Sequence, residues 1–402
     1  QTCALPIYRF SDKLAALKPS AIREIFKSLS DPEIISFAAG NPAAESFPIE
    51  DIRRLSAEIF AETPVAALQY SQTEGYPPLR REVAGRQQKK FGIGSDGDET
   101  IIVSGGNQGI ELTAKVLCNE GDVVVCEEPS FIGALNAFRS NGARPVGVPL
   151  ENDGIDPDRL DAVLSREPRA RFIYLIPTFQ NPAGITTSLE KRKRIYEVAR
   201  RHDVMILEDN PYGELRFAGE DVPTLKSMDT DGRVIYCSSF SKILSAGMRV
   251  GYVTAPAPVI AKMVVAKQVE DVHTNIFFQM LCHRYMTECD LEGHIRDIQA
   301  IYRHKCGLML ECLERELPAS ISFTRPEGGL FVWCTLPDGC DMNAFVARAL
   351  ENKVAVVPGS AFLCDPDGAS RSFRINYSTP SDENIREGCR RLGETARALG
   401  IN

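Results

Sequence analysis

The chain has 402 residues, of which 44% are hydrophobic and 25% are charged, a composition typical of a soluble globular protein long enough for two domains. Its formal net charge of -8 argues against a general nucleic-acid or anionic-membrane surface. No apolar run approaches the roughly 20 residues of a membrane span, and no signal peptide is recognisable. We therefore predict a cytoplasmic protein without a nucleic-acid or membrane partner. The chain does not begin with methionine, and we leave residues 1–7 out of the fold prediction as a truncated or foreign leader.

The cysteines and histidines show no metal-binding pattern. Twelve cysteines are present, yet none belongs to a Cys-x-x-Cys motif, and several lie in apolar, strand-like runs. Buried reduced thiols in a cytosolic protein are therefore favoured over a disulfide framework or a zinc site. The five histidines have no metal-ligand spacing either. We predict that the protein binds no metal.

The N-terminal part of the chain predicts helices and loops around one strand. Residues 8–31 predict a polar lead-in and a short helix that begins near Ser20. An apolar run then ends at Gly40, where the missing side chain lets the backbone approach a ligand closely. Helical patterns cover residues 48–62 and 79–91, and the intervening loop is too polar and too rich in glycine and proline to belong to a core.

Residues 100–207 alternate short apolar or β-branched runs with helical patterns. The expected strands cover residues 100–103, 123–126, 144–148, 172–176 and 204–207, and the expected helices cover residues 108–118, 131–140, 158–165 and 189–201. This order predicts βαβ units, and hence an α/β fold with a mostly parallel sheet in an α/β/α sandwich. In such a sheet the ligand lies beyond the carboxyl ends of the strands, so the residues that follow each strand are the candidates for a site.

The pattern changes after residue 254. One long helix is expected at residues 291–317, as a hinge, and the strands and helices beyond it indicate a smaller α+β domain. We predict an N-terminal arm with part of the small domain at residues 8–48, a large domain at 49–288 and a small domain at 289–402.

Residues 236–252 contain the lysine with the most informative surroundings. A β-rich run leads into a serine-rich turn that holds Lys242, and Arg249 precedes another apolar run. A lysine amine becomes nucleophilic when neighbouring cations or desolvation lower its pKa, and it then forms Schiff bases with carbonyls. Ser239, Ser241 and Arg249 offer the donors that a phosphate dianion prefers. Most Ser-Lys pairs are solvated turn residues, but this segment indicates a phosphorylated aldehyde as ligand.

Other strand ends add to this pattern. The strand that ends at Val103 is followed by Gly105, Gly106 and Asn107, which open a helix, and a helix start exposes the N–H groups that bind phosphate. By itself this turn is a weak indication, because it does not form a Gly-x-Gly-x-x-Gly motif and such turns are common as pure structure.

Three further strand ends present Phe131, Asn181 and Asp209. The Phe131 ring could stack on a planar ligand or pack into the core with equal ease. A buried carboxylate such as Asp209 is costly unless it pairs with a cation, and Tyr212 follows three residues later. Together with Lys242, these groups fit pyridoxal phosphate, which needs a carboxylate at its ring nitrogen, donors at its phenolic oxygen, a ring against its face and a lysine at its aldehyde.

At this point the chain resembles the class I and II aminotransferases of fold type I, closest to the group that contains the 2-aminoadipate, kynurenine and aromatic aminotransferases. The motifs that carry the resemblance occur in the order of the family and span nearly the whole chain: Tyr70–Arg80, Ser104–Gln108, Asn181–Gly184, Asp209–Tyr212, Ser239–Gly251 and Phe373–Tyr377.

The resemblance implies roles for the residues around the cofactor. Lys242 would form the Schiff base with pyridoxal 5′-phosphate and, once freed by the substrate, carry the proton between the substrate α-carbon and the cofactor. Asp209 would pair with the pyridinium nitrogen, and Asn181 and Tyr212 would bond to the phenolic oxygen.

It also implies roles for residues at the phosphate and the substrate. Arg249 and Ser239 would hold the phosphate, joined by Tyr70 from a second subunit, so a homodimer is expected. Arg374 would clamp the substrate α-carboxylate in a bidentate fork, with the backbone of Gly40 nearby.

The chain departs from the family pattern in two places. Gly106-Asn107 stands where the family commonly has Ser-Gln, so the phosphate is expected to depend more on backbone N–H groups. Phe131 replaces a frequent tyrosine, which keeps the stacking surface and loses a hydroxyl. We expect activity to survive both changes, because neither position carries the proton transfer.

These observations predict a cytoplasmic enzyme of amino acid metabolism and biosynthesis that transfers the amine of an L-amino acid to a 2-oxo acid, with 2-oxoglutarate as the expected acceptor. A lyase or decarboxylase with the same cofactor is an alternative. An aminotransferase-like effector domain of a DNA-binding regulator is a further alternative, disfavoured because the roughly thirty residues before Ile34 are not basic.

Overall fold

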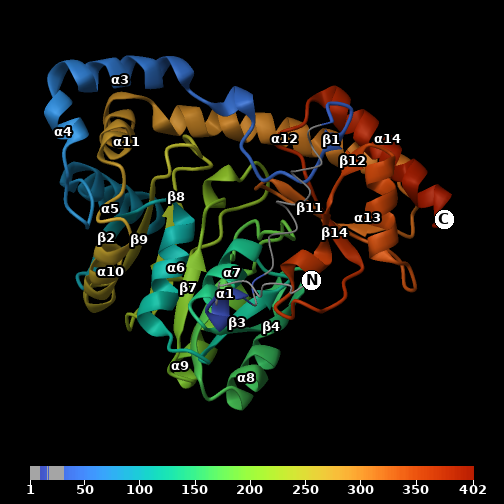
Figure 1. Cartoon of the computed structure of the whole chain (residues 1–402), viewed down its shortest axis with the longest axis horizontal. Helices are drawn as coiled ribbons and strands as arrows, with labels where there is room; N and C mark the ends of the chain where they lie inside the picture. The colour runs from blue at the N-terminus through green and yellow to red at the C-terminus, as the bar shows by residue number, and fades with distance from the viewer. Residues whose placement is uncertain (1–9, 16, 18–30) are drawn as a thin grey trace, which may run out of the picture.

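The computed structural model describes residues 10–15, 17 and 31–402, and it contains one large sheet covered by helices and a smaller unit with its own sheet (Figure 1). The helix expected near Ser20 lies outside the described residues. Among the residues that the structure describes, no helix combines the length and apolarity needed to cross a bilayer.

The large sheet has eight strands, and most of them are parallel. In sheet order they are β2 (Asp98–Val103), β9 (Gly251–Pro256), β8 (Val234–Ser239), β7 (Met205–Asp209), β6 (Ala170–Leu175), β3 (Val123–Glu128), β4 (Arg144–Glu151) and β5 (Gly154–Ile155). Each neighbouring pair from β8 to β4 is parallel, whereas β9 is antiparallel to β2 and β8, and β5 is antiparallel to β4. The predicted mostly parallel α/β sheet is confirmed.

The antiparallel direction of β9 follows from its connection. Residues 240–250, which join β8 to β9, contain no helix, and a parallel return needs a crossover that is usually helical. The short connection therefore leads the chain back antiparallel. It also places Lys242 in a turn just beyond the end of β8.

Helices cover both faces of the large sheet. Alternate residues of β3 belong to different cores, because Val124 and Cys126 join one buried cluster while Val123 and Val125 join another. Burial on both faces explains why this strand is apolar throughout rather than alternating. The helices of this part are α3 (Ile49–Glu62), α4 (Pro64–Leu68), α5 (Pro77–Phe91), α6 (Gly106–Leu117), α7 (Ile132–Ser140), α8 (Pro157–Arg166), α9 (Leu189–Arg201), α10 (Ala257–Glu270) and α11 (Ile276–Glu288).

The long helix α12 (Leu291–Glu316) runs from the helices at one end of the large sheet to the smaller unit (Figure 1). Its first turn is capped by the Asp290 side chain, which accepts a hydrogen bond from the N–H of Gly293 at 2.8 Å. The helix matches the one expected at residues 291–317. Its role as a hinge stays a prediction.

The smaller unit packs helices against a four-stranded sheet whose order is β10-β11-β14-β13. Its elements are β10 (Ser322–Phe323), β11 (Phe331–Thr335), α13 (Met342–Glu351), β12 (Val354–Ala355), β13 (Val357–Pro358), β14 (Ser372–Asn376) and α14 (Asp382–Ala398). The short strand β1 (Ile35–Ser36) pairs in parallel with β12. This pairing favours the assignment of the segment before α3 to the smaller unit, and the domain boundaries themselves stay predictions.

The remaining short elements are α1 (Asp12–Ala15) and the 3-10 helices η1 (Ala44–Ser46), η2 (Gly213–Leu215), η3 (Lys226–Met228) and η4 (Gly359–Phe362).

Candidate active site

A cleft of about 330 Å³ lies beyond the carboxyl ends of β3, β6, β7 and β8, where both parts of the chain meet. Its lining comprises Gly40, Asn41, Gly106, Asn107, Ile110, Phe131, Ile176, Asn181, Asp209, Pro211, Tyr212, Ser239, Ser241, Lys242, Ala246, Arg249, Phe331 and Arg374. Every residue predicted for the site belongs to this lining except Gly105 and Tyr70.

Gly105 and Tyr70 occupy different positions. Gly105 lies against the Arg249 guanidinium, so a Cβ atom there would displace that group, and its φ of +83° is strained for any residue with a side chain. Tyr70 is 81% exposed and lies outside the cleft, where its ring meets the edge of His273 with the ring centroids 5.9 Å apart. Within one chain, Tyr70 is therefore not part of the cleft.

Lys242 projects into the cleft from the turn after β8. Its Nζ donates a hydrogen bond to the Gly40 carbonyl oxygen at 2.7 Å, across 202 residues of sequence. Burial disfavours the ammonium form, and the charges of Arg374 and Arg249 add to this, so the pKa of Lys242 falls to about 8. About a tenth of the amine is therefore neutral and nucleophilic at pH 7, far more than for an ordinary lysine.

Asp209 is the last residue of β7 and is buried. One carboxylate oxygen, Oδ2, accepts a hydrogen bond from the Tyr174 hydroxyl at 2.8 Å. Burial raises the pKa of Asp209 to about 7, and the Tyr174 hydrogen bond opposes that rise. The charged carboxylate thus lacks a cation within the described part of the chain, which suits it to a cationic ring nitrogen.

Tyr174 was not predicted as a site residue. It lies on β6, next to β7, and is fully buried, so its hydroxyl needs a partner inside the protein. A tyrosine within an apolar strand pattern is therefore a weak sequence indication of a buried hydroxyl that needs a hydrogen-bond partner. Which carboxylate it meets depends on the register of β6 against β7.

Ser239, the last residue of β8, lies beside the start of α6, and Ser241 follows it in the turn. The Ser239 hydroxyl donates to Ser241 Oγ at 2.7 Å, and the N–H of Ser241 donates to Ser239 Oγ at 3.0 Å. The Arg249 guanidinium makes only long hydrogen bonds to described residues, to the carbonyl oxygens of Ala246 at 3.3 Å and Ser104 at 3.5 Å. Hydroxyls, a weakly engaged guanidinium and a helix N-terminus together form a seat suited to a phosphate dianion.

Arg374 on β14 is buried and contacts two hydrogen-bond acceptors and two aromatic rings. Its Nη1 donates to Asn181 Oδ1 at 2.9 Å and its Nη2 donates to the Ala38 carbonyl at 2.8 Å, while the ring centroids of Phe331 and Phe362 lie 4.2 and 5.1 Å from the guanidinium. Burial lowers the pKa of Arg374 to about 10, which leaves it charged at neutral pH. Its Nε is buried and has no hydrogen-bond partner among the described residues, so the site has an unused donor for an anion.

The contact with Arg374 also orients Asn181. Because Oδ1 of Asn181 accepts from the guanidinium, the Nδ2 group remains to donate to another acceptor. The buried ring of Tyr212 lies close by and packs edge to face on Phe331, with centroids 5.9 Å apart. Burial raises the pKa of the Tyr212 hydroxyl, so it stays a neutral donor.

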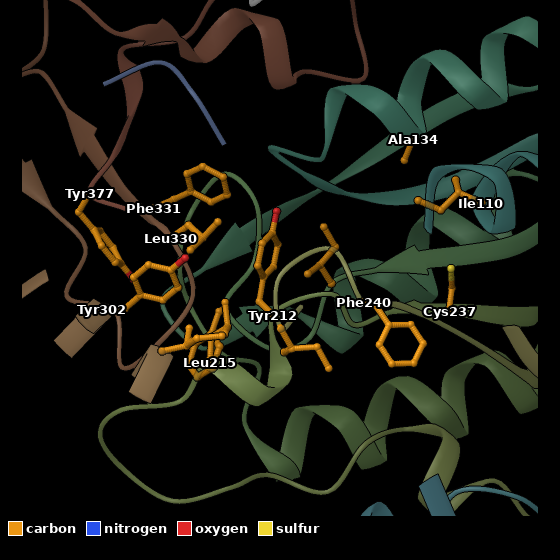
Figure 2. Packing of buried hydrophobic residues seen from close by; sticks show 14 of the residues in the cluster. Ile110, Ala134, Tyr212, Leu215, Cys237, Phe240, Tyr302, Leu330, Phe331 and Tyr377 are labelled. Carbon is orange, nitrogen blue, oxygen red and sulfur yellow. The ribbon is translucent and has the colours of Figure 1, made fainter. Parts of the chain in front are cut away.

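One hydrophobic core supports both sides of the cleft. Figure 2 shows Tyr212 and Leu215 of the large part between Phe331, Leu330 and neighbouring tyrosines of the smaller part on one side, and Phe240 and Cys237 on the other. The cleft also contains residues that the sequence did not identify: Asn41, Ile110, Ile176, Pro211, Ala246 and Phe331. Most are apolar residues like those of the core, and no sequence signal separates the two.

The donor set fits a phosphorylated aldehyde with a cationic ring. Asp209 is a buried carboxylate without a cation among the described residues, Arg249 lies at a helix start with weak partners, and Lys242 is an amine of lowered pKa in the same cleft. These observations match the requirements of pyridoxal 5′-phosphate one by one. The fold and the cleft thus define an α/β enzyme that works with this cofactor.

Comparison with known proteins identifies the family. The chain belongs to the class I and II aminotransferases, whose family model matches residues 32–392. The 2-aminoadipate transaminase of Thermus thermophilus is 41% identical over 393 residues, 97% of each chain. The aromatic-amino-acid aminotransferase 1 of Thermococcus litoralis is 39% identical over 392 residues, 96% of this chain and 94% of that one.

A solved structure agrees with these relatives. The α-aminoadipate aminotransferase of Thermus thermophilus, complexed with N-(5′-phosphopyridoxyl)-L-leucine, superposes with a TM-score of 0.89 at 40% identity over 97% of each chain. The protein is therefore a pyridoxal phosphate-dependent aminotransferase that carries out transamination of amino acids.

Proposed function

We propose that Lys242 is the residue that binds the aldehyde of pyridoxal 5′-phosphate covalently and that the enzyme passes the amine of an L-amino acid to 2-oxoglutarate. The observation that supports this proposal is the cleft itself, where the half-buried Lys242, with a pKa of about 8, faces the same space as buried Asp209 and Arg374. The bound cofactor supplies an electron sink for the bond broken at the substrate α-carbon.

Four residues perform the proton and ring chemistry in this proposal. Asp209 keeps a proton on the ring nitrogen, because a buried carboxylate is stabilised by a cation placed against it. Lys242, once released from the cofactor, takes the proton from the substrate α-carbon and passes it to the cofactor. Asn181 and Tyr212 donate to the phenolic oxygen, since the Asn181 amide has two N–H donors, of which its contact with Tyr212 needs only one, and the Tyr212 hydroxyl is itself a donor.

Substrate and phosphate are held by separate groups of the cleft lining. Arg374 receives the α-carboxylate through its unused Nε and its fork, and its two aromatic neighbours restrict the guanidinium to one plane. Arg249, Ser239, Ser241 and the N–H groups that follow Gly105 hold the phosphate. Phe131 lies against the ring face.

The enzyme is proposed to act as a homodimer in which Tyr70 reaches the phosphate of the partner subunit. Tyr70 lies outside its own cleft and lines a surface hollow together with two other exposed apolar side chains, Phe60 and Leu68. Such a group of apolar side chains on an otherwise charged surface is typical of a protein interface.

A hybrid experiment tests this arrangement. Lys242→Ala and Tyr70→Ala subunits are each expected to be inactive alone, and a mixed dimer contains one site with both native residues if Tyr70 acts across the interface. Activity should therefore return on mixing. Sedimentation at the same concentrations measures the dimer, and a mixture that stays inactive despite exchange of subunits contradicts the proposal.

Reduction with borohydride tests the role of Lys242. The holoenzyme treated in this way is expected to carry the cofactor on the peptide that contains Lys242, by mass spectrometry, and the buried lysine Lys226 serves as the internal control. Amino acids with 2-oxoglutarate should yield glutamate. Ammonia without glutamate would instead indicate a lyase, and a cofactor found on another lysine would refute the assignment.

We also propose that the protein is cytoplasmic. The eleven cysteines among the described residues are all free, as is usual in a reducing compartment. Cell fractionation with an antibody measures this location directly.

A further inference from the structure

A buried cation lies at the end of α10, next to the phosphate turn but outside the cleft lining. The Lys267 side chain is 0% exposed. Its Nζ donates to both carboxylate oxygens of Asp271, at 2.8 and 2.9 Å, and to Gln108 Oε1 at 2.6 Å. All three hydrogen bonds of the ammonium are thus made inside the protein, and none is left for a ligand.

The partners of Lys267 bracket the Gly105-Gly106-Asn107 turn. Gln108 follows the turn, and its side chain donates to Asp271 Oδ2 at 2.9 Å while accepting from the Ser104 N–H at 2.7 Å. Ser104 precedes the turn, and its hydroxyl donates to the same Asp271 oxygen at 2.6 Å. Both ends of the turn are therefore tied to one ion pair.

The network continues to the loop that carries Tyr70. Ser104 Oγ lies 3.0 Å from Thr274 Oγ1, and the Thr274 carbonyl accepts from Gln279 Nε2 at 2.7 Å. Gln279 Oε1 in turn accepts from the N–H of Tyr76, at the end of that loop, at 2.7 Å. Thr274 and Gln279 are buried, so these bonds are shielded from water.

The turn after α10 is also strained. Val272 has a φ of +65°, a value that β-branched residues rarely adopt. Both Asp271 and Val272 donate their N–H groups to the Lys267 carbonyl, at 3.1 and 3.2 Å. Strain of this kind persists only where the surroundings enforce it, and it is concentrated near functional sites.

Stability alone does not explain the hydrogen-bond network around Lys267 and Asp271. An ion pair between a fully buried lysine and a partly exposed carboxylate is a poor source of stability compared with apolar packing, because the ammonium must be desolvated. Two successive glycines, however, give the phosphate turn a large conformational freedom that must be restricted before its N–H groups converge on an anion. Groups anchored on both sides of the turn impose that restriction.

We propose that Lys267 and Asp271 are positioning residues that hold the Gly105-Gly106-Asn107 turn in its phosphate-binding conformation and connect it to the loop that carries Tyr70. This inference rests on the phosphate seat in the function proposed above. Neither residue needs to touch the cofactor, because each acts through Ser104 and Gln108.

The experiment compares two buried lysines in the full-length enzyme. Lys267→Met removes the network, and Lys226→Met is the matched control, because Lys226 is 2% exposed and pairs with Asp98 at 2.8 Å and Asp229 at 3.0 Å. Asp98 begins β2, whereas the phosphate turn follows the carboxyl end of that strand. Both variants are expected to lower the melting temperature.

The deciding measurement is the preference for a phosphorylated cofactor. Dissociation constants for pyridoxal 5′-phosphate and for pyridoxal are measured by absorbance titration of the cofactor-free protein. Lys267→Met is expected to weaken binding of the phosphorylated form by roughly tenfold or more, with pyridoxal unchanged, because only the phosphate contacts are misplaced. Lys226→Met should keep the wild-type ratio of the pyridoxal dissociation constant to the pyridoxal 5′-phosphate dissociation constant.

Further variants separate the positioning role of Lys267 and Asp271 from the phosphate seat itself. If Lys267→Met does not fold, Asp271→Asn replaces it, since the amide keeps the shape and removes the charge, and a fall in the same ratio is expected. An unchanged ratio in the network variant, or an equal fall in Lys226→Met, overturns the positioning role. An unchanged ratio in Arg249→Met overturns the phosphate seat itself, and the positioning role with it.

Discussion

Replacement of Asp209 by asparagine is expected to stabilise the cofactor-free protein at alkaline pH while it weakens the holoenzyme. Asparagine keeps the shape of the side chain and an oxygen that can accept the Tyr174 hydrogen bond, but it removes the charge. In the absence of a cationic ring, the buried carboxylate has only that neutral hydroxyl as a partner among the described residues. Its charge is therefore a cost to folding that the cofactor normally offsets.

The magnitude follows from the pKa. Burial raises the pKa of Asp209 from 3.8 to about 7 in the folded protein, a difference of roughly three units, and each unit corresponds to about 1.4 kcal/mol. Between these two values the folded protein holds a proton that the unfolded chain has lost, so the contribution of this group to stability falls as the pH rises through that window. Above about pH 7 the destabilisation is complete and amounts to roughly 4 kcal/mol.

Urea unfolding of the cofactor-free wild type and Asp209→Asn at about pH 5 and about pH 8 measures this effect. The advantage of the variant should grow by about 2 to 3 kcal/mol between these conditions. Circular dichroism and the fluorescence of Trp333, the single tryptophan, provide two probes whose transitions must coincide for the comparison. Asp203→Asn is the control, because it makes the same replacement at a side chain that is 99% exposed.

In saturating pyridoxal 5′-phosphate the wild type should become more stable than Asp209→Asn. A ligand stabilises the protein more when it binds more tightly, and the variant binds the cofactor more weakly. An advantage that is equal at both pH values would refute the reasoning, because it would mean that Asp209 titrates as an ordinary carboxyl. A variant that binds the cofactor as well as the wild type does would show that this carboxylate does not pair with the ring.

Four further outcomes are expected. Tyr174→Phe should move the pKa of Asp209 upward by about one to two units, seen as a shift of the pH window in the same unfolding experiment, because a hydrogen bond to a charged acceptor contributes roughly 1.5–3 kcal/mol. Arg374→Lys keeps the charge and loses the fork, so kcat/KM for amino acids should fall by about tenfold or more in steady-state assays while the cofactor Kd stays constant. Phe331→Leu removes the ring beneath that guanidinium and should lower kcat/KM about two- to thirtyfold, since a cation–π contact contributes roughly 0.5–2 kcal/mol. The rate of covalent cofactor incorporation should rise with pH toward the Lys242 pKa of about 8, and stopped-flow absorbance of Arg374→Met should show a higher midpoint, because the Arg374 charge helps to lower that pKa.

The sequence was sufficient for the fold class and for most of the charged and polar groups that line the cleft. Apolar runs separated by helical patterns predicted the parallel sheet, and the helix predicted at Leu189–Arg201 has the same bounds in the structure. Because ligands of such sheets bind at the carboxyl ends of the strands, local sequence after each strand was enough to select Phe131, Asn181 and Asp209. These inferences depend on short-range patterns, which a sequence records directly.

The particular pairings depended on tertiary structure. Arg374 meets Asn181 across 193 residues, and Lys242 meets the Gly40 carbonyl across 202. Tyr174 reaches Asp209 only in the observed register of β6 and β7. No local pattern encodes such contacts, because they arise where strand order, register and the packing of two units bring distant segments together. The sequence alone therefore indicated most of the charged and polar groups that line the cleft, and only the folded chain decided which of them meet and which further residues join them, since burial and partners are properties of the packed molecule.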